Sequence, residues 1–329
     1  MVTKGPESKG PESRDLPARG LFFDTATLYY RAFFAVPESV TAPDGTPSGA
    51  VRGFLDMVSS IVRQFPTNQV VFAWDDDWRP AWRVDLVPTY KLHRVEQEIS
   101  SSTVITNAEI EVVPDDLSPQ ISAIANLLDV IGLPRIGQQG HEADDILGAL
   151  VNHSMMSCDV VTGDRDLFQL VNDKNDVRVI SITKGVKKLE IIDDTFLVSK
   201  YGVTGLQYAD FSMLRGDPSD GLPGVLGIGE KTAARLINEH VDIKGLIAAA
   251  KNEQSALAPA VRRNLMNSLA YMNAAGKVVR LKTTARLPRN LAVPLKVKDQ
   301  ESLDDLAKAW GIEKQVNRFL KVLNIHSVT

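Results

Sequence analysis

Residues 158–171 read CDVVTGDRDLFQLV. The first five residues form an apolar run of strand length, a Gly-Asp turn follows, and DLFQLV has the spacing of a short helix. Three other runs have the composition of buried strands: GLFFD at 20–24, QVVFAW at 69–74 and VRVISI at 177–182. Strands of this kind that alternate with helical segments predict an α/β fold with a mostly parallel central sheet flanked by helices.

The helical segments divide the chain into regions. Helical spacing appears at 49–65, 118–131 and 141–156, and Ser118 with Pro119 has the pattern of an N-cap and a first helical residue. From about residue 193 the strand signal fades and short helices take over. KGPES occurs twice within residues 3–13, so we expect a disordered leader over 1–19.

Composition limits the kinds of site that the chain can build. The single cysteine, Cys158, excludes an intramolecular disulfide, and five scattered histidines without HExxH leave oxygen ligands for any metal. Such ligands favour Mg²⁺ or Mn²⁺. No apolar run has the length of a membrane span or a signal peptide, so we expect no membrane partner and a cytoplasmic protein.

Charge is distributed unevenly along the chain, whose formal net charge is −4. Residues 1–230 hold 20 Lys and Arg against 33 Asp and Glu, whereas residues 231–329 hold 17 against 8. An acidic part can bind metal while a basic part binds phosphate. A solvated basic helical surface is an equally good explanation on charge alone.

Acidic residues recur in short clusters at predicted strand ends and helix starts. They occur in HEADD at 141–145, in GDRD at 163–166, in GDPSDGLPG at 216–224, at Asp24 and at 75–77. Helix capping or Asx turns explain each cluster separately. Together they predict carboxylates at one edge of the sheet, where cations would offset their repulsion and support two-metal phosphodiester hydrolysis.

Two basic segments could contact a phosphate backbone. GVLGIGEKTAAR at 224–235 places glycines before a helix that begins near Glu230, with Lys231 and Arg235 adding charge. It lacks the GK[ST] ending of a P-loop, so no nucleotide cofactor is expected, and tight helix packing is the alternative. Residues 82–94, with Trp82, Arg83 and YKLHR, could stack a base or form a surface helix with buried side-chain stems.

The motifs GHEADDIL, TGDRDLFQL, GDPSDGLPGV and GIGEKTAARL, in this order, resemble those of bacterial and phage flap endonucleases. The 5′-nuclease domain of bacterial DNA polymerase I belongs to the same group. The resemblance runs from about residue 20 to about residue 290, and because the chain ends at 329, it implies a stand-alone form. It also implies a PIN-like catalytic core over 20–192, with a helical arch at about 80–117. A helical DNA-binding region would follow over 193–290, with a helix–three-turn–helix element at about 216–250, and residues 291–329 would pack on the core.

The resemblance assigns roles to individual positions. Lys91 and Arg94 would contact the scissile phosphate, with Arg83 as a further catalytic residue, and Tyr90 would stack on a terminal base. The DNA-binding turn would use Gly227, Gly229, Lys231, Thr232 and Arg235, with a possible K⁺ ion bound by backbone carbonyls. For the second strand, counting back from Arg83 favours Asp76 over Asp75. The implied metal ligands are Asp24, Asp76, Glu142, Asp144, Asp145, Asp164, Asp166, Asp217 and Asp220.

The predicted function is therefore a metal-dependent 5′-3′ exonuclease and flap endonuclease that acts on DNA with 5′ flaps, nicks or recessed 5′ ends. Such ends include RNA-primed ones, so the expected context is primer removal and repair by a monomer. One alternative is a family member that binds branched DNA and cuts poorly, although Asp217 and Asp220 favour a complete second metal site. The other is a PIN-like ribonuclease, which would not usually carry GIGEKTA.

Overall fold

The computed structural model describes residues 19–67, 69–95 and 113–327. The leader expected over 1–19 falls outside this range except for Arg19, and the central part of the expected arch, residues 96–112, also falls outside it. No helix among the described residues is long and apolar enough to cross a membrane.

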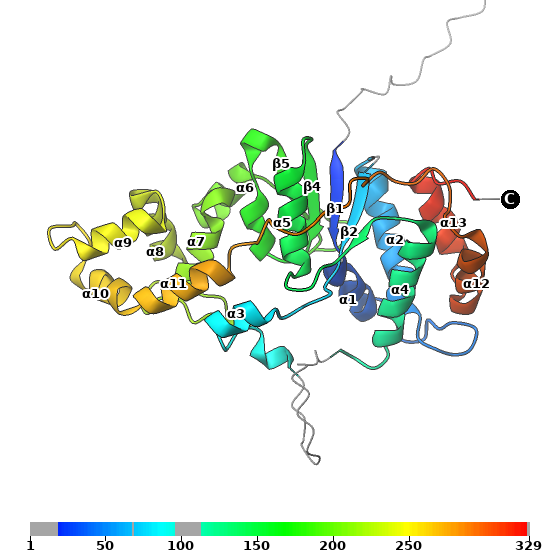
Figure 1. The fold of residues 1–329 in the computed structure, drawn as a ribbon, viewed down its shortest axis with the longest axis horizontal. Helices are drawn as coiled ribbons and strands as arrows, with labels where there is room; N and C mark the ends of the chain where they lie inside the picture. Colours follow the sequence, from blue (N-terminus) through cyan, green and yellow to red (C-terminus); the bar gives the residue numbers. More distant parts are fainter. Residues whose placement is uncertain (1–18, 68, 96–112, 328–329) are drawn as a thin grey trace, which may run out of the picture.

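One six-stranded sheet forms the centre of the protein (Figure 1). Its strands follow the order β3-β2-β1-β4-β5-β6, and β6 alone pairs antiparallel. The sheet contains β1 (Gly20–Asp24), β2 (Gln69–Ala73), β3 (Arg135–Ile136), β4 (Cys158–Thr162), β5 (Val177–Ser181) and β6 (Glu190–Ile192). Strands β2 and β3 are added on one side of β1, and β4, β5 and β6 on the other, so the strand order switches between β1 and β4. The carboxyl ends of β1, β2 and β4 lie together at this switch, where such sheets bind ligands.

Helices cover both faces of the sheet. One face packs against α1 (Thr25–Ala35), α2 (Gly49–Gln64) and α4 (Ser118–Ile131). The carboxyl-terminal helices α12 (Gln300–Trp310) and α13 (Glu313–Val322) add a further layer, because Leu303 and Phe319 are buried in the same core. Residues after 291 thus form part of the folded unit.

The other face is covered by α5 (Ala143–His153) and by a helical region that extends away from the sheet (Figure 1). That region contains α6 (Asp194–Tyr201), α7 (Gly205–Arg215), α8 (Glu230–His240), α9 (Ile243–Lys251), α10 (Pro259–Asn267) and α11 (Leu269–Val278). From α11 an irregular segment returns across the core to α12.

Local signals explain several element boundaries. Asp24 ends β1 and caps α1, because its side chain accepts a hydrogen bond from the Thr27 N–H at 3.3 Å. Ser118 is the first residue of α4, not its cap, and Leu117 occupies the cap position without a side-chain bond. Gln120 is fully buried and its Oε1 accepts the Ala50 N–H at 2.7 Å, so α4 caps the start of α2.

Candidate active site

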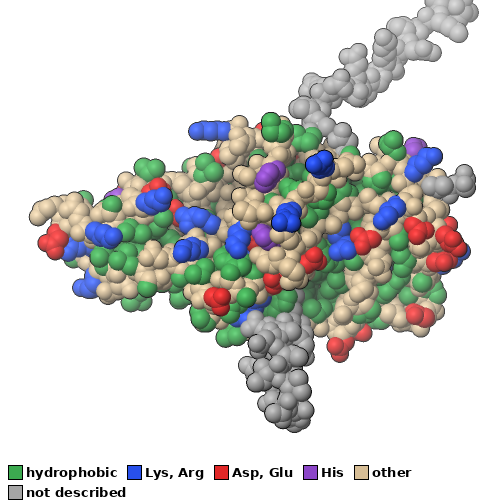
Figure 2. All heavy atoms as spheres, in the orientation of Figure 1, with side chains coloured by type: hydrophobic (Ala, Val, Ile, Leu, Met, Phe, Trp, Pro, Cys, Tyr) green, Lys and Arg blue, Asp and Glu red, His purple; other side chains and the backbone are tan. Residues whose placement is uncertain are grey.

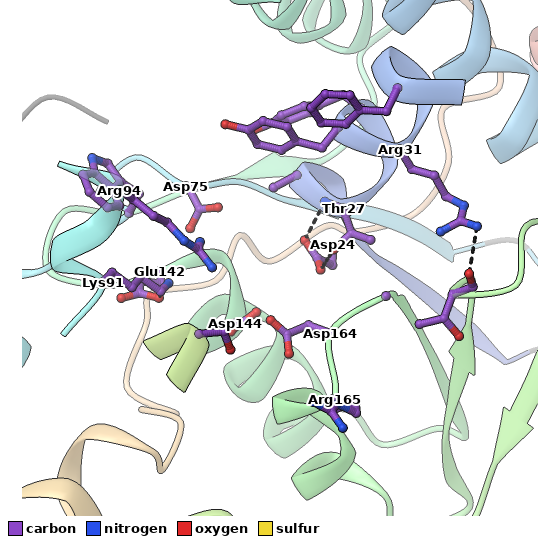
Figure 3. A pocket seen from close by; sticks show the side chains of 18 of the residues that line it. Asp24, Thr27, Arg31, Asp75, Lys91, Arg94, Glu142, Asp144, Asp164 and Arg165 are labelled. Carbon is purple, nitrogen blue, oxygen red and sulfur yellow. Dashed lines mark hydrogen bonds and ion pairs between the residues drawn. The ribbon is translucent and has the colours of Figure 1, made fainter. Parts of the chain in front are cut away.

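A cavity of about 1050 Å³ opens at the carboxyl ends of β1, β2 and β4 (Figure 3). Its acidic lining comes from segments that are far apart in sequence and meet at this sheet edge. The carboxylates that line the cavity are Asp24, Asp75, Glu142, Asp144 and Asp164. This arrangement brings together four of the nine carboxylates that the resemblance implies.

Asp24 lies at the floor of the cavity with about 5% of its surface exposed. It accepts hydrogen bonds from the Thr27 hydroxyl and from Thr162 Oγ1, the latter at 2.7 Å. Burial raises the pKa of Asp24, the two threonine hydroxyls partly offset this rise, and the charge of Asp164 adds to it. The carboxylate is therefore held in one orientation but is short of positive charge.

The neighbouring Asp144 shares this deficit, whereas Glu142 is paired with basic side chains. Burial raises the pKa of Asp144 well above its usual value, and the charges of Asp164 and Asp24 raise it further. Burial also raises the pKa of Glu142, although Lys91 and Arg83 oppose the rise. Among the residues that the structure describes, Glu142 Oε1 has no hydrogen-bond partner, and it lies 3.3 Å from the Arg83 guanidinium. The carboxylate oxygens of Asp24 and Asp144 are suited to a cation that the protein side chains do not supply.

The structure places Asp75, not Asp76, in the cavity. Asp75 accepts the Ala143 N–H at 2.8 Å at the start of α5, and burial raises its pKa. The carboxylate of Asp76 instead lies against Gly137 on the loop after β3. Counting back from Arg83 favoured Asp76, but a count of residues does not show which side chain faces the cavity. Strand β2 ends at Ala73, and the chain turns within the three aspartates that follow.

A second acidic group lies beside the first. Burial and the charge of Asp164 raise the pKa of Asp166 well above its usual value, and the charges of Asp220 and Asp217 add to the rise. Asp217 caps the short 3₁₀ helix Pro218–Asp220 by accepting the Ser219 N–H at 2.9 Å. These three acids do not line the cavity, but the charge of Asp164 raises the pKa of both Asp166 and Asp220, which connects the group with the cavity.

The residues present fit divalent cations with oxygen ligands. Every acid of the cavity whose pKa is shifted has it raised, mainly by burial, so positive charge would stabilise the ionised forms. Within 19–67, 69–95 and 113–327, no three His, Cys, Asp or Glu side chains already surround one point closely enough to hold an ion alone.

Two basic side chains face these acids from the segment that precedes the undescribed residues (Figure 3). Lys91 makes an ion pair with Glu142 and donates its backbone N–H to the Asp220 carbonyl at 3.3 Å. Its φ of 47° is left-handed, a conformation that non-glycine residues adopt mainly under constraint at special sites. Burial lowers the pKa of Lys91, but Glu142 and Tyr90 more than offset this, so it stays protonated. Arg94 lines the same cavity.

Tyr90 and Arg83 occupy positions unlike those that the resemblance implies. The Tyr90 ring is about 3% exposed and its hydroxyl donates to Glu142 Oε2 at 3.1 Å, so it offers no face to a base. Arg83 is about 2% exposed and donates to both oxygens of Asp145, each at 2.8 Å. Asp145 itself is fully buried and does not line the cavity. Bonds to α5 and α11 account for the position of Arg83, which donates to Asp145 of α5 and to the Val278 carbonyl of α11.

Other residues at the cavity were assigned no role from the sequence. Arg31 reaches it from α1 and donates to the Thr183 carbonyl at 2.9 Å. Tyr30, Phe34, Trp78 and His93 form an aromatic rim, and about 76% of Phe34 is exposed. The many aromatic residues around Asp24 in FFDTATLYYRAFF would have been a usable signal.

Two of the predicted DNA-binding residues, Gly227 and Gly229, lie on the turn between α7 and α8, and the other three lie on α8 itself. Gly227 has a φ of 73°, and Gly229 is exposed, with nothing within 4 Å of the place that a Cβ atom would occupy. Lys231 is exposed in the first turn of α8, with the half-buried Thr232 beside it. Arg235 also lies on the surface, but it forms an ion pair with Glu239 at 2.8 Å.

Basic residues continue beyond this turn. Residues 254–298 contain no Asp or Glu and nine Lys or Arg. Figure 2 shows Lys and Arg side chains over the helical region and along the segment that returns from α11 to the core. A positive surface therefore adjoins an acidic cavity, which is the arrangement expected of a protein that binds a phosphate backbone and a metal.

This fold, with its carboxylate-lined sheet edge and adjoining basic turn, defines a nuclease of the 5′-nuclease class. The chain belongs to the 5′-3′ exonuclease family. Residues 19–202 match the family described as "5'-3' exonuclease, N-terminal resolvase-like domain", and residues 203–302 match "5'-3' exonuclease, C-terminal SAM fold". The protein is accordingly a 5′-3′ exonuclease, as the motifs predicted.

Named relatives share most of the chain. The 5′-3′ exonuclease of Streptomyces coelicolor is 46% identical over 92% of this chain and 99% of its own. That of Mycobacterium tuberculosis is 40% identical over 92% of this chain and 97% of its own. DNA polymerase I of M. tuberculosis is 36% identical over 80% of this chain but only 27% of its own length.

Solved structures confirm the fold. The phage T5 D15 protein, co-crystallised with metal ions, aligns with a TM-score of 0.60 at 17% identity over 93% of this chain and 99% of its own. The catalytic core of Rad2 in complex with DNA substrate aligns with a TM-score of 0.53 at 15% identity, over 93% of this chain and 92% of its own. At these identities the likeness concerns the fold alone.

Proposed function

We propose that this exonuclease cuts DNA at 5′ flaps, nicks and recessed 5′ ends, including RNA-primed ones, and that its acidic sheet edge binds Mg²⁺ or Mn²⁺. The observation that carries the proposal is one cavity lined by five carboxylates and by Lys91 and Arg94. Support also comes from the T5 protein, which was crystallised with metal ions and with DNA, and from Rad2 with its DNA substrate.

The proposed ligands divide into two groups. The first contains Asp24, Asp75, Glu142, Asp144 and Asp164, and the second contains Asp166, Asp217 and Asp220. When bound, divalent ions supply charge that stabilises the phosphoryl transition state and activate a water molecule for attack. Asp24 is oriented by Thr27 and Thr162, so its carboxylate would be fixed before an ion arrives. Such preorganisation favours tight binding.

The chain's own cations would act on the phosphate. Lys91 now neutralises Glu142, and an incoming ion would take over that carboxylate and free the ammonium group for the scissile phosphate. Arg94 stands in the same cavity with a planar guanidinium that matches phosphate oxygens. Preorganised donors of this kind stabilise charge that develops in the transition state. The aromatic rim of Tyr30, Phe34, Trp78 and His93 would hold unpaired bases by stacking.

The α7–α8 turn would hold the duplex. Gly229 has no side chain, and the backbone N–H groups that begin α8 are exposed, so a phosphate can approach them closely. Lys231 adds positive charge there, whereas Arg235 would first have to leave Glu239. Contacts of this kind fix position without reading sequence. A K⁺ ion at this turn is part of the proposal, and replacing KCl with LiCl in a binding assay tests it.

The central test is cleavage of an end-labelled 5′-flap DNA, with and without Mg²⁺, and with an RNA strand for comparison. We expect cleavage near the branch that EDTA abolishes. Asp75→Asn should reduce kcat by about 100-fold or more, whereas the matched variant Asp76→Asn should stay within a few-fold of wild type, because its carboxylate points away. Cleavage that resists EDTA, or full activity of Asp144→Asn, would overturn the proposal.

A further inference from the structure

Asp145 and Arg83 make a buried ion pair directly behind the acidic cavity. Arg83 Nη1 and Nη2 donate to Asp145 Oδ2 and Oδ1, each at 2.8 Å, in the side-by-side geometry of a strong Arg–carboxylate pair. Asp145 is fully buried, and Arg83 is about 2% exposed. Both residues belong to motifs of the family, and the motifs alone give Asp145 the role of a metal ligand.

The hydrogen bonds of Asp145 leave no oxygen lone pair for a metal. Besides the two bonds from Arg83, Oδ2 accepts the Glu142 N–H at 3.1 Å and Oδ1 accepts the Lys282 N–H at 2.7 Å. A carboxylate offers about four acceptor sites, so four donors fill it. Asp144, the adjacent residue, instead lines the cavity, and no hydrogen bond to its carboxylate is found among the described residues.

The pair joins three segments, two of which lead to residues that line the cavity. Arg83 lies on α3 (Ala81–Leu86), which leads to Lys91, and its Nε also donates to the Val278 carbonyl at the end of α11, at 3.2 Å. Asp145 holds the backbone of Glu142 at the start of α5. The ion pair from Arg83 Nη1 to Glu142 Oε1, at 3.3 Å, restrains the side chain of the same residue.

We infer that Asp145 and Arg83 are positioning residues that hold Glu142 and the segment leading to Lys91 in place, and that Asp145 is not a metal ligand. This inference rests on the proposed metal-dependent function. It predicts that loss of either partner disturbs catalysis in the same way, because each keeps the other in place. It also separates two adjacent acids of one motif, Asp144 as a ligand and Asp145 as a positioning residue.

The test compares Asp145→Asn, Arg83→Met and Asp144→Asn by calorimetric titration with Mn²⁺ and by single-turnover cleavage. We expect Asp144→Asn to weaken Mn²⁺ binding at least tenfold, while Asp145→Asn and Arg83→Met stay within about threefold of wild type. The last two variants should lower kcat by similar factors, and Arg83→Lys should restore part of the loss. The double variant should lose no more than either single one, as expected of residues that act as a unit.

Weakened Mn²⁺ binding in Asp145→Asn, with Arg83→Met unaffected, would overturn the inference. Should either variant fail to fold, hydrogen exchange on the wild-type protein decides the question. The Lys282 amide should keep the same protection in EDTA and in Mg²⁺, because Asp145 retains its four donors, and faster exchange with Mg²⁺ contradicts this. If the wild type binds Mn²⁺ but cuts no DNA, the proposed function fails while the titrations still test the roles of Asp144 and Asp145.

Discussion

Gly221→Ala is a sharp test of how the second acidic group is attached to the site. Gly221 follows Asp220 with a φ of 71°, and a Cβ atom there would lie 2.1 Å from the Thr89 carbonyl oxygen. The same junction contains a bond from Thr89 Oγ1 to the Gly221 carbonyl at 2.8 Å, and the bond from the Lys91 N–H to the Asp220 carbonyl. The glycine therefore lets the loop with Asp217 and Asp220 dock against the segment with Lys91.

The size of the effect follows from the geometry. An ordinary carbon–oxygen contact needs about 3.4 Å, so alanine would push the two segments apart by roughly 1 Å. A displacement of about 1 Å in a catalytic arrangement costs about 100-fold in rate. The left-handed backbone adds a stability cost of about 1 kcal/mol or more. We therefore expect kcat on a 5′-flap substrate to fall by about 100-fold, with a smaller change in KM.

Gly45→Ala is the matched control. Gly45 has a φ of 92°, but nothing lies within 4 Å of its added Cβ, so it has the backbone cost without the clash. Thermal unfolding should show destabilisation of both variants, because each places alanine in a left-handed backbone conformation. Single-turnover cleavage should fall in Gly221→Ala only. Rates for the two variants within about threefold of each other would refute the docking argument.

Three further predictions address other parts of the molecule. Lys91→Ala should lower kcat by about 100-fold or more and leave DNA affinity in Ca²⁺ nearly unchanged, and Lys188→Ala at an exposed position is the control. A loss of DNA affinity as large as the loss of kcat would contradict a transition-state role. Phe319→Ala should lower the free energy of unfolding by about 3–5 kcal/mol in urea titrations, and near-wild-type stability would show that α13 is not part of the core. In EDTA, the melting temperature should fall as pH rises from about 4 towards neutrality. Burial raises the pKa values of the cavity acids, so stability present at low pH is lost as they ionise, and Mg²⁺ should remove this fall.

The sheet was predictable because its signals are local. Four of the strands are apolar runs, and each appears within about one residue of its expected limits. The two missed strands, β3 and β6, have two and three residues and lie at the edges of the sheet, so neither carries a pattern that could be distinguished from a loop. Helix α1 was missed because aromatic residues occupy many of its positions and hide the helical period.

The direction of side chains was much less predictable than their position. Whether Asp75 or Asp76 enters the cavity depends on how the chain turns after β2, which no spacing specifies. The resemblance implied that Tyr90 stacks on a terminal base, yet the fold buries its ring and uses its hydroxyl. Arginine is rarely fully buried without a partner, so the burial of Arg83 depends on Asp145, 62 residues away.

The same reasoning explains why a motif cannot separate ligands from the residues that orient them. In HEADD, one turn of α5 directs Asp144 towards the cavity and Asp145 towards Arg83, and the two acids differ by one step of the helix. A substitution at either residue would reduce activity. Neither a sequence motif nor a loss of activity therefore tells which of the two residues is the ligand. Only the count of occupied lone pairs distinguishes them, since the bonds to Asp145 are complete before any ion binds, whereas Asp144 has oxygens that a cation can use. Roles in such a site therefore have to be assigned oxygen by oxygen from the structure.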